Sequence, residues 1–144
     1  MEGCFDWPFP PSETESTFLP IILFIAIFAG CTSTNSNWER VSAEDFSEEI
    51  ENNPDVFILD VRTQDEWEED GHLKGATLIP HSSLESRDSE LPIDKEETLL
   101  VYCRSGNRSQ QAAQTLQEMG YNDIIELESG IIGWKDAGYS VVND

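Results

Sequence analysis

The sequence feature that most constrains the fold is a short apolar segment joined by a tight polar turn to an amphipathic segment. Residues 98–102 read TLLVY, and their β-branched and aromatic side chains favour a buried strand. Residues 108–119 read RSQQAAQTLQEM, with apolar side chains at helical spacing, and Gly120 follows as a helix terminator. A strand that leads directly into a helix is typical of parallel sheets, because parallel strands need a crossover connection.

The same alternation continues through the rest of the chain. Further apolar runs predict strands at 56–59, 77–79 and 124–127. Three more helices are predicted at 43–52, 64–70 and 131–137, and a weaker polar helix begins near Ser82 and Glu85 and ends at 91–92. This order predicts an α/β domain with a four- to five-stranded parallel sheet and helices on both faces.

Two of these helices carry sequence signals in their first turn. Ser42 stands three residues before Asp45, and Thr63 stands three residues before Glu66, which is the spacing of a capping box. Gly71 follows the second helix and favours its termination there. We therefore expect both helices to begin immediately after the hydroxyl residue.

Charge limits the classes of partner that the chain can bind. The 144 residues include 29 acidic and 8 basic side chains, for a formal net charge of −21. Such a surface repels a phosphate backbone and argues against nucleic-acid binding. The apolar residues nonetheless come in strand-like runs, so we expect a folded chain rather than a disordered one. Its length fits one domain of ordinary size, which we assign to residues 39–144.

The first thirty residues read as a targeting segment. Residues 18–30, FLPIILFIAIFAG, carry no charge and have the length of a signal-peptide core, whereas a spanning helix needs about 20 residues. Small residues and then Cys31 follow, which resembles the lipobox of bacterial and archaeal lipoproteins. The resemblance implies lipidation of Cys31, export from the cytoplasm and a membrane attachment, with residues 31–38 as a polar tether. The preceding stretch is acidic instead of basic, so an uncleaved membrane anchor is the alternative.

Cysteine usage directs attention to Cys103. The chain has three cysteines, Cys4, Cys31 and Cys103, which are too few for a disulfide framework. If the leader is removed and Cys31 is lipidated, Cys103 has no partner within its own chain. It is then either a small buried residue at the end of a strand or a group with a chemical role.

The loop after the clearest strand favours the chemical role. Open α/β sheets place ligands beyond the carboxyl ends of their strands, and Cys103 stands there. Gly106 and Asn107 tolerate the left-handed backbone of a tight turn, which would direct N–H groups toward the sulfur and stabilise a thiolate. Arg104 and Arg108 are two of the five arginines in the chain and predict a locally positive site for an anionic substrate.

Four separated stretches resemble rhodanese-like sulfurtransferases, in the family's order. They are CRSGNRS at 103–109, preceded by LLVY, together with SAEDF at 42–46, LDVRTQDEWEEDGHLKGATLIP at 59–80 and ESGIIGWKDAGY at 128–139. The resemblance covers residues from about 40 to 142, nearly all of the predicted domain.

The resemblance implies a five-stranded parallel sheet and a ping-pong sulfur transfer. Cys103 would accept a sulfane sulfur from a small anionic donor such as thiosulfate, as a persulfide, and pass it to cyanide, a thiol or a protein acceptor. The loop that would hold the sulfur consists of Arg104, Ser105, Gly106, Asn107, Arg108 and Ser109. A ring of N–H donors suits a persulfide anion on independent physical grounds.

Loop length argues against phosphatase chemistry. The related phosphatases and arsenate reductases have one more residue between the cysteine and the arginine, and surround a tetrahedral oxyanion. Here four residues separate Cys103 from Arg108. The smaller ring suits a single sulfur atom better than a phosphate.

Asp60 and Arg62 end the strand that we expect beside the one leading to Cys103. The resemblance implies a mainly architectural role for this pair, with direct substrate contact as the alternative, and a packing role for His72. Acidic and histidine side chains do not cluster at metal-ligand spacing and no CxxC motif occurs, so we predict neither a metal nor another cofactor.

Two further function classes stay open from the sequence. The domain could be a non-catalytic or weakly active module that binds sulfur or a partner protein. It could also pass a different thiol electrophile through the same cysteine in detoxification or redox relay.

Overall fold

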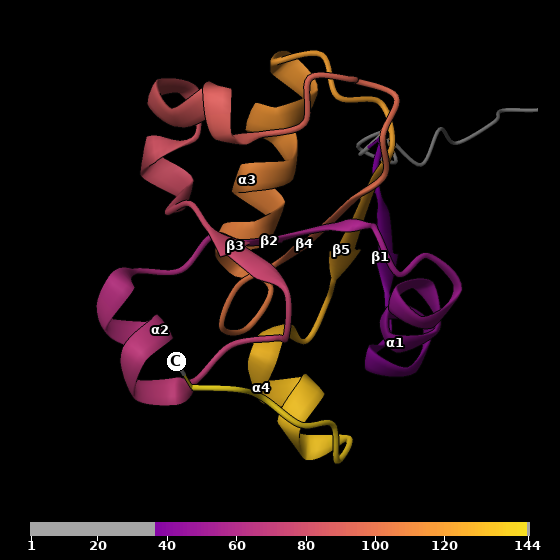
Figure 1. Cartoon of the computed structure of the whole chain (residues 1–144), viewed down its shortest axis with the longest axis vertical. Helices are drawn as coiled ribbons and strands as arrows, with labels where there is room; N and C mark the ends of the chain where they lie inside the picture. Colours follow the sequence, from indigo (N-terminus) through magenta and orange to yellow (C-terminus); the bar gives the residue numbers. More distant parts are fainter. Residues whose placement is uncertain (1–36, 144) are drawn as a thin grey trace, which may run out of the picture. The chain divides into compact units, whose positions relative to one another are not determined.

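The computed structural model describes residues 37–143, which form a five-stranded parallel sheet with helices on both faces (Figure 1). The strand order across the sheet is β1-β5-β4-β2-β3, and every registered pair is parallel. The strands are β1 (Glu39–Val41), β2 (Phe57–Asp60), β3 (Ala76–Leu78), β4 (Leu99–Tyr102) and β5 (Ile124–Leu127). The predicted fold class is confirmed, and β4, which was predicted as a buried strand, lies at the centre of the sheet.

The helices begin and end close to where the sequence predicts. They are α1 (Ala43–Asn52), α2 (Gln64–Asp70), α3 (Asn107–Glu118) and α4 (Gly130–Asp136). The hydroxyl of Ser42 accepts from the backbone N–H of Asp45, and Thr63 and Glu66 form the expected capping box. These local bonds satisfy donors that a helix leaves unpaired in its first turn.

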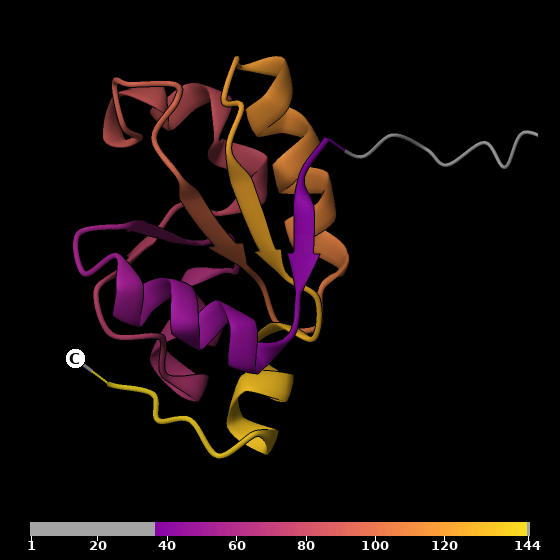
Figure 2. The ribbon, with the colours of Figure 1, turned by 90° about the vertical axis from the view of Figure 1, so that its right-hand side faces the viewer.

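Two apolar cores pack against the sheet, beneath helices that lie on its opposite faces (Figure 2). Residues 99, 101 and 103 belong to the core beneath α3, whereas Leu100 and Tyr102 belong to the core that includes residues of α1 and α4. This alternation is the period of two that a strand imposes on its side chains. Cys103 therefore belongs to the α3 side of the sheet.

Two segments differ from the sequence-based expectation. The edge strand β1 was not predicted as a strand, because Val41 is its single apolar residue and Glu39 and Arg40 are exposed. The polar segment predicted as one weak helix, from Ser82 and Glu85 to 91–92, is helical but does not form a single helix. The segment instead forms two short 3₁₀ helices, η1 (His81–Ser83) and η2 (Glu85–Glu90), with no side-chain cap. It has no apolar face on which a longer helix could pack, and Leu84 between the two is its buried anchor.

The carboxyl ends of the central strands meet at one edge and position the site. Asp60 of β2 pairs with Tyr102 of β4, and Val101 of β4 pairs with Glu126 of β5. The chain that leaves β2 carries Arg62, and the chain that leaves β4 begins with Cys103. Residues far apart in the sequence are thereby brought to a common edge.

The predicted leader, the tether up to residue 36 and lipidation at Cys31 lie outside the described residues. Within residues 37–143 the longest helices fall short of the length and apolar character needed to cross a membrane. The predicted domain boundary at residue 39 stays a prediction.

Candidate active site

The sulfur of Cys103 lies at the base of the turn between β4 and α3. The residue is 1% exposed. The backbone N–H of Gly106 donates to Sγ at 3.1 Å, and the hydroxyl oxygen of Ser109 lies 3.4 Å from Sγ. An N–H donor aimed at sulfur stabilises a thiolate over a thiol. The thiolate is the form that attacks electrophiles.

Gly106 gives the loop its shape. Its φ of +89° is left-handed, and a Cβ at this position would collide with the backbone carbonyl of Glu128. Glycine is therefore required both by conformation and by space. Asn107 does not share the left-handed backbone that the sequence analysis allowed it, because it is already the first residue of α3. The turn is accordingly one residue tighter than expected.

Backbone hydrogen bonds from the start of α4 fix the beginning of the loop. The backbone N–H groups of Ile131 and Ile132 donate to the carbonyls of Cys103 and Arg104, at 2.9 and 3.2 Å. Gly130 permits this approach, because a Cβ there would collide with the backbone of Arg104. The first two carbonyls of the loop are thus fixed by a segment nearly thirty residues away.

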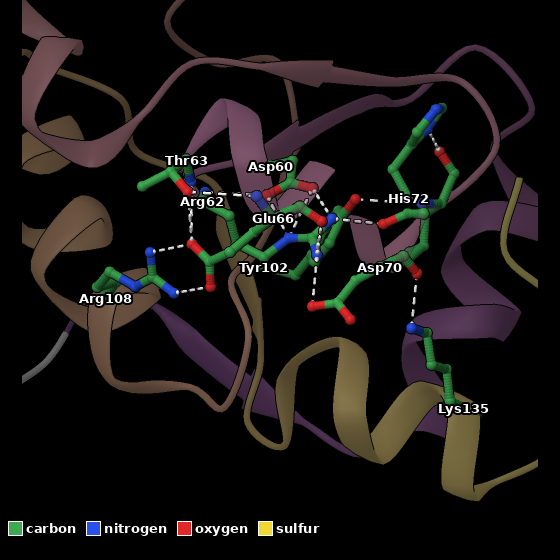
Figure 3. A network of polar contacts seen from close by, with 11 residues as sticks. Asp60, Arg62, Thr63, Glu66, Asp70, His72, Tyr102, Arg108 and Lys135 are labelled. Atoms are coloured by element: carbon green, nitrogen blue, oxygen red, sulfur yellow. Dashed lines mark hydrogen bonds and ion pairs between the residues drawn. The ribbon is translucent and has the colours of Figure 1, made fainter. Parts of the chain in front are cut away.

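Arg108 is engaged in a two-point ion pair with Glu66 of α2 (Figure 3). Both N–O distances are 2.6 Å. The hydrogen bonds from Arg108 lower the pKa of Glu66 to about 2, and Glu66 in turn raises the pKa of Arg108. Arg108 therefore brings a largely compensated charge to the loop, whereas the side chain of Arg104 is exposed.

Asp60 and Arg62 form a buried polar hub between the end of β2 and α2 (Figure 3). Both side chains are fully buried, and Arg62 donates to the Asp60 carboxylate at 2.7 to 3.0 Å. Arg62 also donates to the backbone carbonyls of Glu66 and Gly71, at 3.2 and 2.7 Å, and so anchors α2 near its middle and at its end. This burial and these partners favour the architectural role over substrate contact.

The surroundings of the hub raise the pKa values of Arg62 and Tyr102. Burial lowers the pKa of Arg62, but the hydrogen bond and charge of Asp60 together outweigh burial and raise it. Burial, and then the negative charge of Asp60, raise the pKa of the Tyr102 phenol, which accepts from the backbone N–H of Leu73 at 3.1 Å. His72 stacks on Trp67 with ring centroids 3.5 Å apart, which agrees with its predicted packing role.

Glu126 and Arg40 belong to the site but were not predicted from the sequence. Glu126 is a fully buried carboxylate on β5, and it accepts from the Ser109 hydroxyl and from Nε of Arg40, each at 2.5 Å. Its signal in the sequence was a single acidic residue inside the apolar run IIEL. A buried charge normally needs such partners, so a charge within a predicted strand should direct a search for them.

The structure gathers the predicted loop residues at the carboxyl edge but gives them different settings. Cys103, Gly106 and Ser109 are buried, whereas Arg104, Ser105 and Asn107 are exposed and form the rim. Within residues 37–143, no cluster of three or more His, Cys, Asp or Glu residues is arranged to hold a metal. The catalytic and binding roles of these residues stay predictions.

Comparisons with known proteins point to one family. The model of the rhodanese-like domain matches residues 42–137. The chain is 34% identical over 103 residues to a sulfurtransferase from Allochromatium vinosum, covering 72% of this chain and 94% of that protein. It is 38% identical over 81 residues to a thiosulfate sulfurtransferase from Coxiella burnetii, covering 56% of this chain and 73% of that protein.

A solved structure is similar over the same region. A rhodanese-related protein from Thermoplasma volcanium superposes with a TM-score of 0.64 at 32% identity, covering 74% of this chain and 99% of that one. Other curated relatives are longer proteins, of which the chain spans 52% and 28%.

Proposed function

The chain belongs to the rhodanese-like domain family, and we propose that it is a sulfurtransferase that carries sulfane sulfur on Cys103. The observation that carries the proposal is the setting of the Cys103 sulfur, at the end of the central strand with the Gly106 N–H donating to it. The sulfurtransferases among its relatives support the same reaction class.

The donor that we propose is thiosulfate or a similar small anion, as the name of the Coxiella relative suggests. The Cys103 thiolate attacks the sulfane sulfur, a new S–S bond forms, and the old S–S bond breaks with its electron pair leaving on sulfite. The product is a cysteine persulfide anion. A thiophilic acceptor, such as cyanide or a thiolate, then attacks the outer sulfur, and the Cys103 thiolate leaves unchanged.

The loop supplies stabilisation in this scheme. The Gly106 N–H donates to sulfur at 3.1 Å, a distance at which a fixed dipole stabilises a developing anion. Because this peptide group is held by the left-handed turn, little reorganisation accompanies the reaction. The exposed Arg104 would meet an approaching anion first.

Turnover with thiosulfate and cyanide tests the proposal, with thiocyanate formation as the readout. The full chain carrying Cys4→Ser and Cys31→Ser should form thiocyanate at the wild-type rate, since both cysteines precede the domain. Adding Cys103→Ser should reduce the rate to background, because a hydroxyl cannot form a persulfide. Equal turnover with and without Cys103 would refute the assignment. Stoichiometric sulfur uptake without turnover would identify a sulfur-binding module instead of an enzyme.

We also propose that the domain is exported and tethered to a membrane through a lipid on Cys31. The support is the uncharged segment at 18–30, the small residues that end it and the polar stretch at 31–38. In cells fed a labelled fatty acid, the wild-type chain should take up label and partition into detergent, and Cys31→Ser should do neither. Detergent partition without label would indicate the uncleaved anchor, and recovery in the aqueous phase would contradict both.

A further inference from the structure

A continuous line of polar contacts connects the Cys103 sulfur to a buried carboxylate. Ser109 Oγ lies 3.4 Å from Sγ and donates to Glu126 at 2.5 Å, and Arg40 donates to the other carboxylate oxygen at 2.5 Å. Cys103, Ser109 and Glu126 are each exposed by 1% or less. The line crosses from the β4–α3 turn to β5 and on to the edge strand β1.

We propose that Glu126 takes up the proton of the Cys103 thiol through the Ser109 hydroxyl, and so generates the attacking thiolate. Ser109 would be a catalytic residue, since it touches the reacting sulfur, and Glu126 a positioning residue that acts through it. The inference rests on the proposed function for its purpose, because sulfur transfer is what a thiolate at this position would serve.

The hydrogen-bond directions support this route. A serine hydroxyl has one proton, and Ser109 gives it to Glu126, so toward Cys103 the oxygen can only accept. Among residues 37–143, the groups that contact the Glu126 carboxylate are two donors, Ser109 and Arg40, which leave its oxygens as the acceptors of the route. In the proposed resting state, the Cys103 thiol therefore donates to Ser109, and the Glu126 carboxylate is the base.

Proton transfer reverses the direction of both hydrogen bonds, between Cys103 and Ser109 and between Ser109 and Glu126. The Cys103 S–H proton moves to Ser109 Oγ while the Ser109 proton moves to Glu126, and no atom or charge is lost. The carboxylic acid then donates to Ser109, and Ser109 donates to the thiolate, which the Gly106 N–H also stabilises. When the acceptor has removed the sulfur and the thiolate is restored, the proton returns from Glu126 by the same route.

The other charged groups near Cys103 keep their charge while this pair exchanges a proton. Arg108 is close enough to interact with Cys103 and Asp60, and its pKa is raised by Glu66. The pKa of Glu66 is lowered to about 2 by Arg108, so both members of that pair remain ionised near neutral pH. Arg40 compensates Glu126 from β1.

Alkylation of Cys103 by iodoacetamide, followed by intact mass, reports the thiolate without any sulfur donor. The samples are full chains with Cys4→Ser and Cys31→Ser. Where the Cys103–Glu126 pair shares a constant number of protons, the thiolate fraction created by internal transfer is independent of pH. A thiol without an internal base instead loses about tenfold in rate for each pH unit below neutrality, because only the thiolate reacts.

We expect the wild-type alkylation rate to change less than about twofold between about pH 7 and 5.5. Glu126→Gln and Ser109→Ala should restore the fall of about tenfold per pH unit. The matched control is Glu90→Gln, which breaks an exposed ion pair with Arg87 within η2 and should keep the plateau. If Glu126→Gln does not fold, as judged by circular dichroism, the smaller change Ser109→Ala decides.

A wild-type rate that falls about tenfold per pH unit overturns the inference, because no internal base is then present. A plateau that survives Ser109→Ala also overturns it, since the route through the hydroxyl is absent. The same samples are assayed for thiocyanate formation. A plateau without turnover would support the proton relay and count against the proposed sulfur transfer, and turnover without a plateau would do the reverse.

Discussion

Two carboxylates flank the Cys103 loop, one on either side of β4, and they are used differently. Glu66 comes from α2, which follows β2, has a side chain 19% exposed and binds Arg108 at two points. Glu126 comes from β5, is fully buried and binds Ser109, whose oxygen lies beside the sulfur. Glu66 forms an ion pair with Arg108 and so attaches the loop to α2. Glu126 reaches the nucleophile through one hydroxyl.

The difference shows that partner and burial decide what a glutamate does beside a nucleophile. A guanidinium that engages both oxygens holds Glu66 ionised, so it acts as a fixed charge. Glu126 has a hydroxyl on one oxygen and an arginine on the other, and in the proposed relay it exchanges a proton along the hydrogen bond from Ser109. We therefore expect changes on the α2 side to affect stability and charge, and changes on the β5 side to affect thiol reactivity.

The largest expected effect comes from breaking the hub that anchors α2. Asp60→Asn leaves the Arg62 guanidinium buried without a counter-charge, since both side chains are fully buried. Removing one partner of a buried ion pair costs about 3–5 kcal/mol of unfolding free energy. Urea unfolding at neutral pH measures the loss, and Glu90→Gln at the exposed pair with Arg87 should cost far less, because solvent screens that pair. A cost for Asp60→Asn as small as that of the control would contradict the architectural role.

A smaller effect, confined to acidic pH, is expected from Glu66. Because its folded pKa is lowered to about 2, its contribution is fully present above its usual pKa and is lost as pH falls through about 2. After allowance for solvent screening of a partly exposed pair, this contribution is about 1 kcal/mol. Glu66→Gln should be less stable than wild type by that amount near neutrality, and the difference should vanish toward pH 2.

The measurement is urea unfolding of both proteins at several pH values, in which other titrating groups cancel in the difference. Glu118→Gln, on the exposed side of α3, serves as the control and should differ from wild type by an amount that does not depend on pH. A Glu66→Gln difference that stays constant from neutral to acidic pH would mean that the ion pair with Arg108 does not hold the carboxylate ionised.

The smallest effect concerns the charge that an anionic donor meets. Arg104→Ala removes an exposed positive charge and should raise the KM for thiosulfate by about threefold at low salt, less at high salt. Glu66→Gln frees Arg108 from compensation and should lower the same KM by a similar factor. Initial-rate kinetics with thiosulfate and with an uncharged donor separate the two. Shifts of equal size and sign with both donors would indicate a change in loop shape instead of charge.

The fold was largely predictable from the sequence because its signals are local. The apolar runs at 56–59 and 124–127, the capping box at Thr63 and the glycine after α2 each specify their element through near neighbours. The strand β1 was not predictable in this way, because its three residues become a strand by pairing with β5, from Glu39 with Ile125 to Val41 with Leu127. The three residues of β1 carry no local signal for a partner strand that lies more than eighty positions away in the sequence.

The site divides along the same line. The strand, the left-handed Gly106 and the following helix are local, and they indicated the position of the Cys103 sulfur. The ion pair of Arg108 with Glu66 spans 42 residues, and the bond of Arg40 with Glu126 spans 86. The sequence predicted Arg108 as an available positive charge for an anionic substrate. In the fold, Glu66 of α2 compensates that charge.

The central claim is that Cys103 carries sulfur as a persulfide, and intact mass measures this directly. The full chain with Cys4→Ser and Cys31→Ser is incubated with thiosulfate, desalted and weighed, then treated with cyanide and weighed again. We predict a gain of one sulfur atom that maps to the peptide containing Cys103, and a return to the starting mass after cyanide. No mass gain, or a gain that persists in Cys103→Ser, would contradict the account.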